Sequence, residues 1–181
     1  MPRYKKVLAA LDFSECASDV AAHAADVAAA FGASAVVLHV DQLPAGIDPD
    51  TPIRPGPTGE EVDAAAYLRD GSRKQLSRFA PFFEAKGVAV EQHVKTGKVA
   101  DAILEAIDDV GADLVVMGTH GRRGLSRLML GSVAEAVMRG AKCPVLTVRT
   151  LHKPSCEAAN CNWCATDVTD EMRNVEAETT G

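Results

Sequence analysis

An α/β domain built on a doubly wound parallel sheet is the fold class that the sequence predicts. Short aliphatic runs, such as AVVLHV at residues 35–40 and DLVVM at residues 113–117, alternate with longer segments that have the hydrophobic period of a helix. The aliphatic runs lack alternating polar positions, which is typical of parallel strands covered by helices on both faces. With 181 residues and 47% hydrophobic side chains, the chain is long enough to bury a single core.

Each expected element follows from a local pattern. The helix at 14–31 has apolar residues at three- and four-residue steps and ends before Gly32, which tolerates the positive φ of a helix C-terminus. A helix at 60–86 is expected to bend at Pro81. Five prolines and three glycines make residues 41–59 a long irregular loop. Strands are predicted at 5–11, 35–40, 88–94, 113–117 and 144–148, with further helices at 98–110 and 132–139.

Charge and composition divide the chain into two parts. The folded domain is expected to span residues 1–149, and residues 150–181 form a polar tail. Residues 151–181 contain two basic and six acidic side chains, so −4 of the net charge of −6 lies there. A net acidic chain argues against a nucleic-acid partner bound through a basic face.

No membrane or secretion segment is recognisable in the sequence. No apolar run approaches the roughly 18–20 residues of a membrane helix, and the N-terminal apolar stretch is too short for a signal peptide. We therefore expect a cytoplasmic protein without a membrane partner.

A glycine-punctuated loop follows the strand predicted at 113–117. In an open parallel sheet, ligands bind beyond the carboxyl ends of the strands, where the strand order reverses. The loop begins Gly118-Thr119-His120-Gly121 and ends Gly131-Ser132, and Ser132 opens a helix whose unpaired amide groups favour an anion. The pattern indicates a phosphate-binding loop, with a plain loop that has glycine at its ends as the alternative. It is neither a Walker A loop nor the dinucleotide GxGxxG fingerprint.

The segment DLVVMGTHGRRGLSRLMLGSVAEAVMRGAKCPVLTVR resembles the C-terminal half of a universal stress protein. Its Gly-x2-Gly-x9-Gly-Ser pattern matches the ATP-binding signature of that family, and VLAALDFSE near the N-terminus and the strand ending in His39-Val40 support the resemblance over about residues 3–149. The resemblance implies a five-stranded sheet of order 3-2-1-4-5. It also implies binding of an adenine nucleotide, ATP or AMP, and a homodimer built on the last strand.

The resemblance assigns roles to individual positions. Asp12 is expected to contact the ribose or, through Mg²⁺, the phosphates; alternatively, Asp12 and Glu15 form a capping box for the first helix. The backbone of Val40 is expected to meet the adenine. Met117 abuts the base or belongs to the sheet core. The remaining expected contacts are Ala10 and Leu11, which line the pocket, and Gly118, Gly121, Gly131, Ser132 and Val133, which hold the phosphates and ribose.

Basic and imidazole side chains near the loop have two interpretations. Arg122, together with Arg123 and Arg127, can neutralise a triphosphate or belong to a solvated basic loop. His39 and His93 lie in predicted strands and are interpreted as satisfied sheet residues rather than ligands.

The tail departs from the family pattern because it gathers three cysteines within nine residues. His152, Cys156, Cys161 and Cys164 form an H-x3-C-x4-C-x2-C set that is sufficient for tetrahedral Zn²⁺. An iron–sulfur site would need a distal fourth cysteine, and the Cys161-x-x-Cys164 pair could act in thiol redox chemistry. The alternative is an unstructured acidic tail with incidental thiols, and the resemblance does not cover this segment.

The sequence therefore indicates a nucleotide-dependent regulatory protein of the stress response. We identify no catalytic residues, because no paired carboxylates or nucleophile–base pair are placed to act on a phosphate, so hydrolysis of ATP should be slow and helped by Mg²⁺. The competing hypothesis is an enzyme, a nucleotide hydrolase or transferase that uses the same sheet and loop. A stress protein that acts purely by dimerisation is a second alternative, against which the intact glycine set argues.

Overall fold

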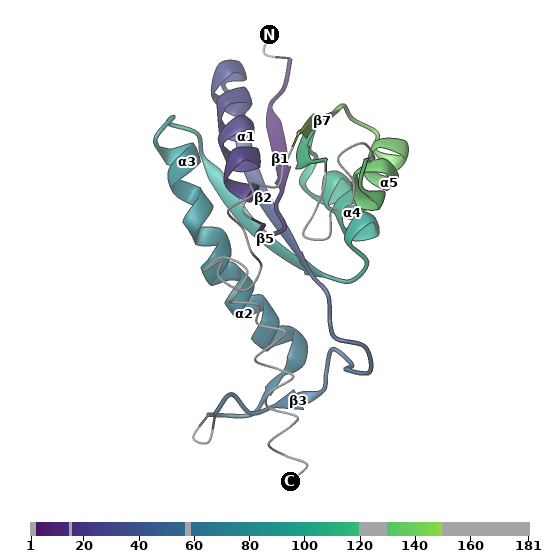
Figure 1. The fold of residues 1–181 in the computed structure, drawn as a ribbon. Helices are drawn as coiled ribbons and strands as arrows, with labels where there is room; N and C mark the ends of the chain where they lie inside the picture. The colour runs from purple at the N-terminus through teal and green to yellow at the C-terminus, as the bar shows by residue number, and fades with distance from the viewer. Residues whose placement is uncertain (1–2, 15, 57–58, 120–129, 150–181) are drawn as a thin grey trace.

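The computed structural model describes residues 3–14, 16–56, 59–119 and 130–149 (Figure 1). Its main sheet has five parallel strands in the order β5-β2-β1-β6-β7. Taken in chain order within this sheet, the arrangement is 3-2-1-4-5, which confirms the expected topology. The strands are β1 (Lys6–Ala10), β2 (Ser34–Asp41), β5 (Val90–Thr96), β6 (Leu114–Gly118) and β7 (Val145–Val148).

Helices cover both faces of this sheet, with α4 and α5 lying opposite α1 (Figure 1). The first layer contains α1 (Ala17–Phe31), α2 (Ala64–Leu76), the 3-10 turn η1 (Ser77–Phe79) and α3 (Ala80–Glu84). The second layer contains α4 (Val99–Val110) and α5 (Ser132–Gly140). Within the described ranges, no helix is both long and apolar enough to cross a membrane.

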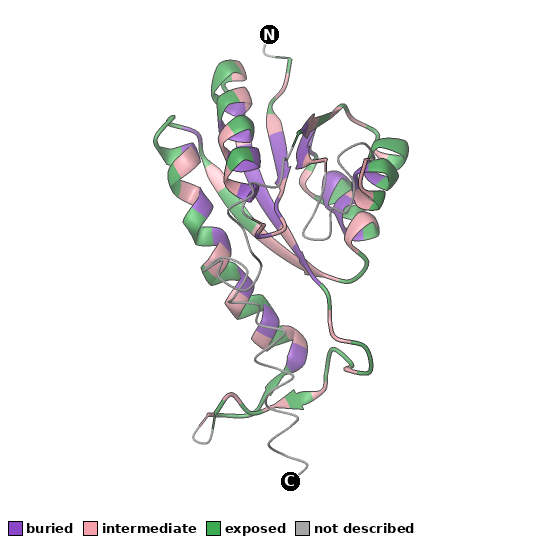
Figure 2. Cartoon of the chain, viewed as in Figure 1, coloured by how far each residue is buried: buried purple, intermediate pink, exposed green. Residues whose placement is uncertain are grey.

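The central strands β1, β2 and β6 are mostly aliphatic because their successive side chains enter different cores. Val7 and Ala9 of β1 pack with α1, whereas Leu8 between them packs with α4, and all three are fully buried. The buried residues in Figure 2 accordingly follow the central strands and the helix faces that meet them. This two-sided burial is the physical reason for the missing polar alternation in the sequence.

The helix predicted at 60–86 is divided at a different position from the one expected. The chain tightens into η1 at Ser77–Phe79, and Pro81 lies in the first turn of α3. A proline cannot donate to the carbonyl four residues before it, and its ring clashes with that carbonyl, here the one of Ser77. The break therefore occurs one turn before the proline rather than at it.

Three further details differ from the expectation. The edge strand β5 begins at Val90 rather than at Val88, because the Val88 amide donates to the Phe83 carbonyl of α3 at 3.0 Å and sheet pairing starts with Val90 opposite Ala35. The loop at 41–59 contains a short strand, β3 (Pro52–Ile53), which pairs antiparallel with β4 (Val62–Asp63). The strand predicted at 144–148 begins one residue later, as β7 at Val145, and Cys143 lies half-buried in the bend before it.

Candidate functional site

The order of the strands reverses between β1 and β6. From β1 the chain adds β2 and then β5 on one side, and it adds β6 and then β7 on the other. Ala10 at the end of β1 is the register partner of Met117 in β6, so the segments that leave these two strands start side by side. Asp12 follows β1 and Gly118 ends β6, which places both at the point where open α/β sheets bind ligands.

The two described ends of the glycine loop meet at this point. The Gly131 amide donates to the Thr119 carbonyl at 2.8 Å, and the Thr119 amide donates to the Val148 carbonyl of β7 at 2.9 Å. Gly131 is the N-cap of α5 and provides no side-chain cap, and Ser132, the first helical residue, is exposed. The amide groups in the first turn of α5 are therefore directed to the same edge of the sheet as the end of β6.

The backbone of Gly131 does not itself require glycine. Its φ of −63° and ψ of 146° are accessible to every residue. A glycine at this position is needed only where another group approaches the backbone so closely that a Cβ atom would interfere.

Asp12 belongs to a turn rather than to a helix cap. Its Oδ1 accepts hydrogen bonds from the Ser14 amide at 3.1 Å and from the Ser14 hydroxyl at 2.7 Å. Because α1 begins at Ala17 with Cys16 as its N-cap, the interpretation of Asp12 as the N-cap of a capping box is wrong. The carboxylate instead stabilises the turn that leads out of β1.

Three of the predicted pocket residues share one face of the sheet. Ala10, Val40 and Met117 belong to the core beneath α4 and α5, and Val133 of α5 packs against the same core. Leu11 lies on the other side, buried in the core beneath α1. The structure therefore places the first three on one face near the ends of β1, β2 and β6, whereas the Leu11 side chain faces away from them.

A polar cluster around His39 was not recognised as part of the site from the sequence. The His39 Nδ1 atom lies 2.7 Å from the Leu11 carbonyl oxygen, and its Nε2 atom lies 3.5 Å from Asp41 Oδ1. Ser72 of α2 donates to the same Asp41 oxygen at 2.5 Å, and the Phe13 ring stacks on the imidazole with a centroid distance of 3.8 Å. The expectation that His39 is a satisfied sheet residue is confirmed. Its spacing from Asp41 is the signal that could have revealed the cluster, since residues two apart in a strand share a face.

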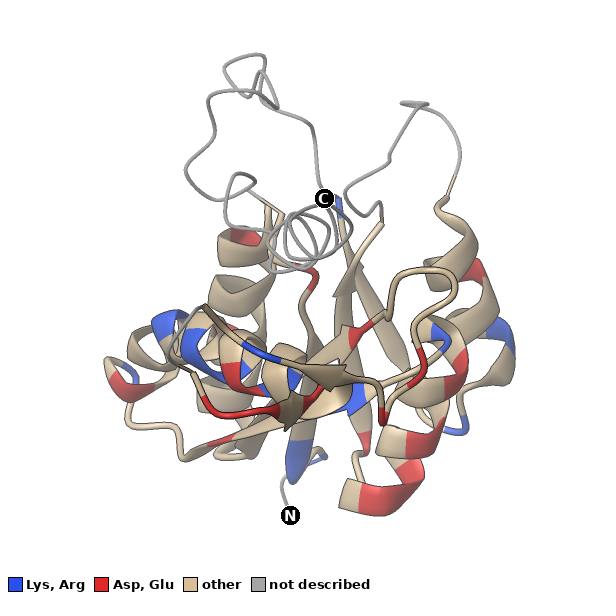
Figure 3. Cartoon of the chain, turned by 90° about the horizontal axis from the view of Figure 1, so that it is seen from below, with Lys and Arg blue, Asp and Glu red and all other residues tan. Residues whose placement is uncertain are grey.

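Other predicted positions lie outside the described residues. They are Gly121, Arg122, Arg123 and Arg127 of the loop and His152, Cys156, Cys161 and Cys164 of the tail. Among the residues that the structure does describe, no group of three or more His, Cys, Asp or Glu side chains could hold a metal ion. The helices α1 and α4 carry acidic residues and no Lys or Arg, whereas α2 and α5 carry both (Figure 3).

Comparison with known proteins gives relatives over nearly the same length. The universal stress protein MJ0531 of Methanocaldococcus jannaschii is 32% identical over 146 residues, which cover 81% of this chain and 82% of that protein. The universal stress protein A homolog 1 of Coxiella burnetii is 34% identical over 150 residues, which cover 80% of this chain and 96% of that protein.

Solved structures with the same fold include the protein MJ0577 of Methanocaldococcus jannaschii, with a TM-score of 0.64 and 23% identity over 83% of this chain and 99% of that one. A universal stress protein crystallised in complex with cAMP has a TM-score of 0.56 and 25% identity, over 80% of this chain and 96% of that one. The sequence also matches the universal stress protein family over residues 3–149. The chain is a member of the universal stress protein family.

Proposed function

We propose that this chain binds an adenine nucleotide, ATP or AMP, between the end of β1 and the N-terminus of α5. The observation that carries the proposal is the 2.8 Å hydrogen bond from the Gly131 amide to the Thr119 carbonyl, which brings the end of β6 to the first turn of α5. The related universal stress protein solved in complex with cAMP supports an adenine nucleotide as the class of ligand.

The phosphates are assigned to the loop and the start of α5. Amide groups in the first turn of a helix bind anions, and each such contact contributes about 0.3–1 kcal/mol. Gly118, Gly131, Ser132 and Val133 supply the described part of this cradle. Gly121 and Arg122 complete it in our proposal.

The base and the ribose are assigned to the other side of the same edge. Ala10, Val40 and Met117 lie in the same apolar cluster on one side of the sheet, and we assign the base to the ends of their strands, with the backbone of Val40 meeting the adenine. Leu11 contributes through its backbone in this proposal, since its side chain lies in the opposite core. Asp12 contacts the ribose or, when ATP is bound, a Mg²⁺ ion on the phosphates, because carboxylate oxygens are ligands that Mg²⁺ prefers.

The chain acts in our proposal as a regulatory binding protein of the stress response. Among the described residues, Asp12 is the one acidic residue that directly follows either of the strands between which the strand order reverses, β1 and β6. Its carboxylate already accepts hydrogen bonds from the amide and the hydroxyl of Ser14. A lone carboxylate can hold a metal or a hydroxyl group, but it does not form the acid–base pair of an efficient hydrolase. Turnover of Mg-ATP well above background that is abolished in Asp12→Ala would instead favour the hydrolase or transferase hypothesis.

The nucleotide site is proposed to lie in a domain of residues 1–149, with residues 150–181 as a separate tail. The proposed state of the protein is a homodimer formed along β7, which ends the described sheet on one side. The tail contributes nothing to the nucleotide site in this proposal.

The nucleotide content of the purified full chain tests the proposed ligand. Denaturing the protein and chromatographing the supernatant should release an adenine nucleotide, or the nucleotide-free protein should bind ATP or AMP in calorimetry. Absence of both results would contradict the proposed function.

Gly131→Val locates the phosphates. Valine can adopt the backbone angles found at Gly131, so the fold should be retained, but its Cβ branches would obstruct an anion at the helix N-terminus. Affinity should fall by at least about tenfold, equivalent to about 1.4 kcal/mol. Ala136→Val, at an exposed position of the same helix, is the matched control and should bind normally. Equal affinity of the Gly131→Val protein and the wild type would show that the phosphates lie elsewhere.

A further inference from the structure

The imidazole of His39 is held in one orientation from both ends. Because a carbonyl oxygen can only accept, the 2.7 Å contact between Nδ1 and the Leu11 carbonyl places a proton on Nδ1. The opposite atom, Nε2, faces Asp41 Oδ1 at 3.5 Å. Asp41 is itself only 5% exposed, and the hydroxyl of Ser72 binds the same oxygen at 2.5 Å.

Aromatic packing fixes the plane of the same ring. Phe13 lies against His39 with an interplanar angle of 23°, and Phe79 also stacks with Phe13, with a centroid distance of 6.3 Å and an angle of 5°. The three rings are contributed by the segment after β1, by β2 and by η1. The imidazole therefore joins three elements at the end of the sheet.

The segment held by this ring is the one that carries Asp12. The Leu11 amide donates to the Leu38 carbonyl at 2.9 Å, and its carbonyl accepts from His39, so β2 binds both backbone groups of Leu11. Two residues later, Phe13 has a φ of 59°, in the left-handed region that non-glycine residues rarely adopt. Such a conformation is unfavourable and persists only where the surrounding structure imposes it.

We propose that His39 is a positioning residue of the nucleotide site: its Nδ1–H bond to the Leu11 carbonyl and its stacking with Phe13 hold the 11–14 turn in the conformation that presents Asp12 to the ligand. Asp41 and Ser72 orient the imidazole for this role. The inference rests on the proposed nucleotide function and adds to it the residue that fixes the position of Asp12 in the site.

Two substitutions by amide side chains distinguish the contribution of the hydrogen bond between His39 and the Leu11 carbonyl from the contribution of side-chain packing. In His39→Asn the side-chain amide can be placed where Nδ1 was and can donate to the Leu11 carbonyl. In His39→Gln the amide reaches the position of Nε2, toward Asp41, and leaves the Leu11 carbonyl without this donor. Nucleotide affinity should stay within about threefold of wild type for His39→Asn and should fall at least about tenfold for His39→Gln, the range of one charge-assisted or buried hydrogen bond.

A third variant and a matched control complete the set. His39→Phe keeps a ring against Phe13 but has no donor, so it should lose affinity as His39→Gln does. His93 of β5 also lies 3.5 Å from a carboxylate, that of Glu91, but its side chain is 40% exposed and points to the other face of the sheet. His93→Asn and His93→Gln should therefore bind nucleotide as the wild type does.

The experiment measures nucleotide affinity by calorimetry and amide hydrogen exchange of the nucleotide-free full chain by NMR. Exchange of the Ser14 amide, which donates to Asp12 Oδ1, should be faster in His39→Gln and unchanged in His39→Asn. Equal loss of affinity in His39→Asn and His39→Gln, or affinity within about twofold of wild type in all His39 variants, would overturn the inference while the proposed function stands.

Failure of the proposed function gives a different result. If the wild type itself binds no adenine nucleotide, the assignment to a nucleotide site is wrong. The hydrogen exchange of Ser14 then still decides whether His39 holds the turn, since that measurement needs no ligand.

Discussion

At the scale of a single residue, Phe13 combines deep burial with an unfavourable backbone. The side chain is only 3% exposed and packs in the core beneath α1, while its φ of 59° is one that glycine adopts easily and other residues do not. The apolar contacts of the ring must therefore outweigh the backbone cost, which is about 1–2 kcal/mol for a residue with a Cβ atom in this region.

Replacing Phe13 by alanine and by glycine separates these two contributions. Phe13→Ala should lower the free energy of unfolding by about 3–5 kcal/mol, because it removes the buried ring but keeps the Cβ atom. Phe13→Gly loses the same ring and relieves the backbone, so it should be about 1 kcal/mol more stable than Phe13→Ala. Denaturant unfolding monitored by circular dichroism measures both values.

Phe83 is the matched control, since it is fully buried but lies in the helix α3. There the order should be reversed, with the glycine variant about 1 kcal/mol less stable than the alanine variant, because glycine disfavours helical backbone. A glycine variant at Phe13 that is less stable than the alanine variant would contradict the strain assigned to this residue.

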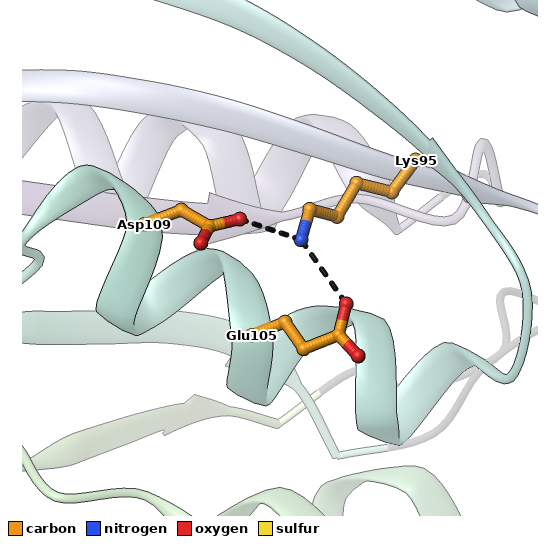
Figure 4. Close-up of polar contacts among 3 residues, drawn as sticks. All are labelled: Lys95, Glu105 and Asp109. Carbon is orange, nitrogen blue, oxygen red and sulfur yellow. Dashed lines mark hydrogen bonds and ion pairs between the residues drawn. The ribbon is translucent and has the colours of Figure 1, made fainter.

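At the scale of elements, Lys95 ties the edge strand β5 to the helix α4. Its Nζ atom donates to Asp109 at 2.7 Å and to Glu105 at 3.3 Å, one helical turn apart (Figure 4). The hydrogen bond with Asp109, opposed in part by desolvation and aided by Glu105, raises the pKa of Lys95 above its usual value of 10.5. A charged lysine on an edge strand also disfavours pairing with a second sheet.

The raised pKa of Lys95 determines the direction in which its contribution to the free energy of unfolding changes with pH. A group with a higher pKa in the folded state binds its proton more tightly there, so its stabilisation is complete below pH 10.5 and is lost as the pH rises through the folded-state value. Lys95→Met should therefore lower the free energy of unfolding by about 0.5–1 kcal/mol at neutral pH. The difference from wild type should shrink above about pH 10.5.

Thermal or urea unfolding between neutral pH and about pH 11 measures this difference. Lys74→Met is a suitable control, because among the described residues the ion pair of Lys74 is with Asp70 of the same helix α2. A Lys95→Met effect that grows with increasing pH would contradict the assignment.

The elements themselves could be predicted largely from local patterns, and the departures have local causes. The helices follow from helical periods, and four of the strands follow from aliphatic runs, since two-sided burial leaves no polar alternation. The edge strand β5 follows instead from its alternation of apolar and polar residues. The position of η1 depends on the clash between a proline ring and a carbonyl four residues earlier. The pairing of β3 with β4 involves two residues on each strand, too few to produce a periodic signal.

At the scale of the whole molecule, the place of the candidate site was predictable from the strand order. The resemblance to the family implied the order 3-2-1-4-5, which places the reversal between β1 and β6, and the glycines mark where, in our proposal, the backbone approaches an anion. The role of His39 was not predictable, because it requires Phe13 to adopt a conformation against its intrinsic preference. Only the folded chain shows that rings from β2 and η1 both stack with Phe13.

The proposed dimer is a property of the whole molecule, and a substitution at one exposed residue can test it. Leu146 of β7 is 38% exposed on the strand that ends the described sheet, whereas the opposite edge, β5, carries Glu91 and Lys95. A dimer formed along β7 would bury Leu146, so Leu146→Asp should convert a dimer into a monomer in light scattering, because a buried unpaired charge costs several kcal/mol. Val62→Asp is the control, since Val62 is equally exposed at 36% but lies on β4, outside the main sheet. A Leu146→Asp protein that remains dimeric, or a wild type that is monomeric, would exclude β7 as the interface.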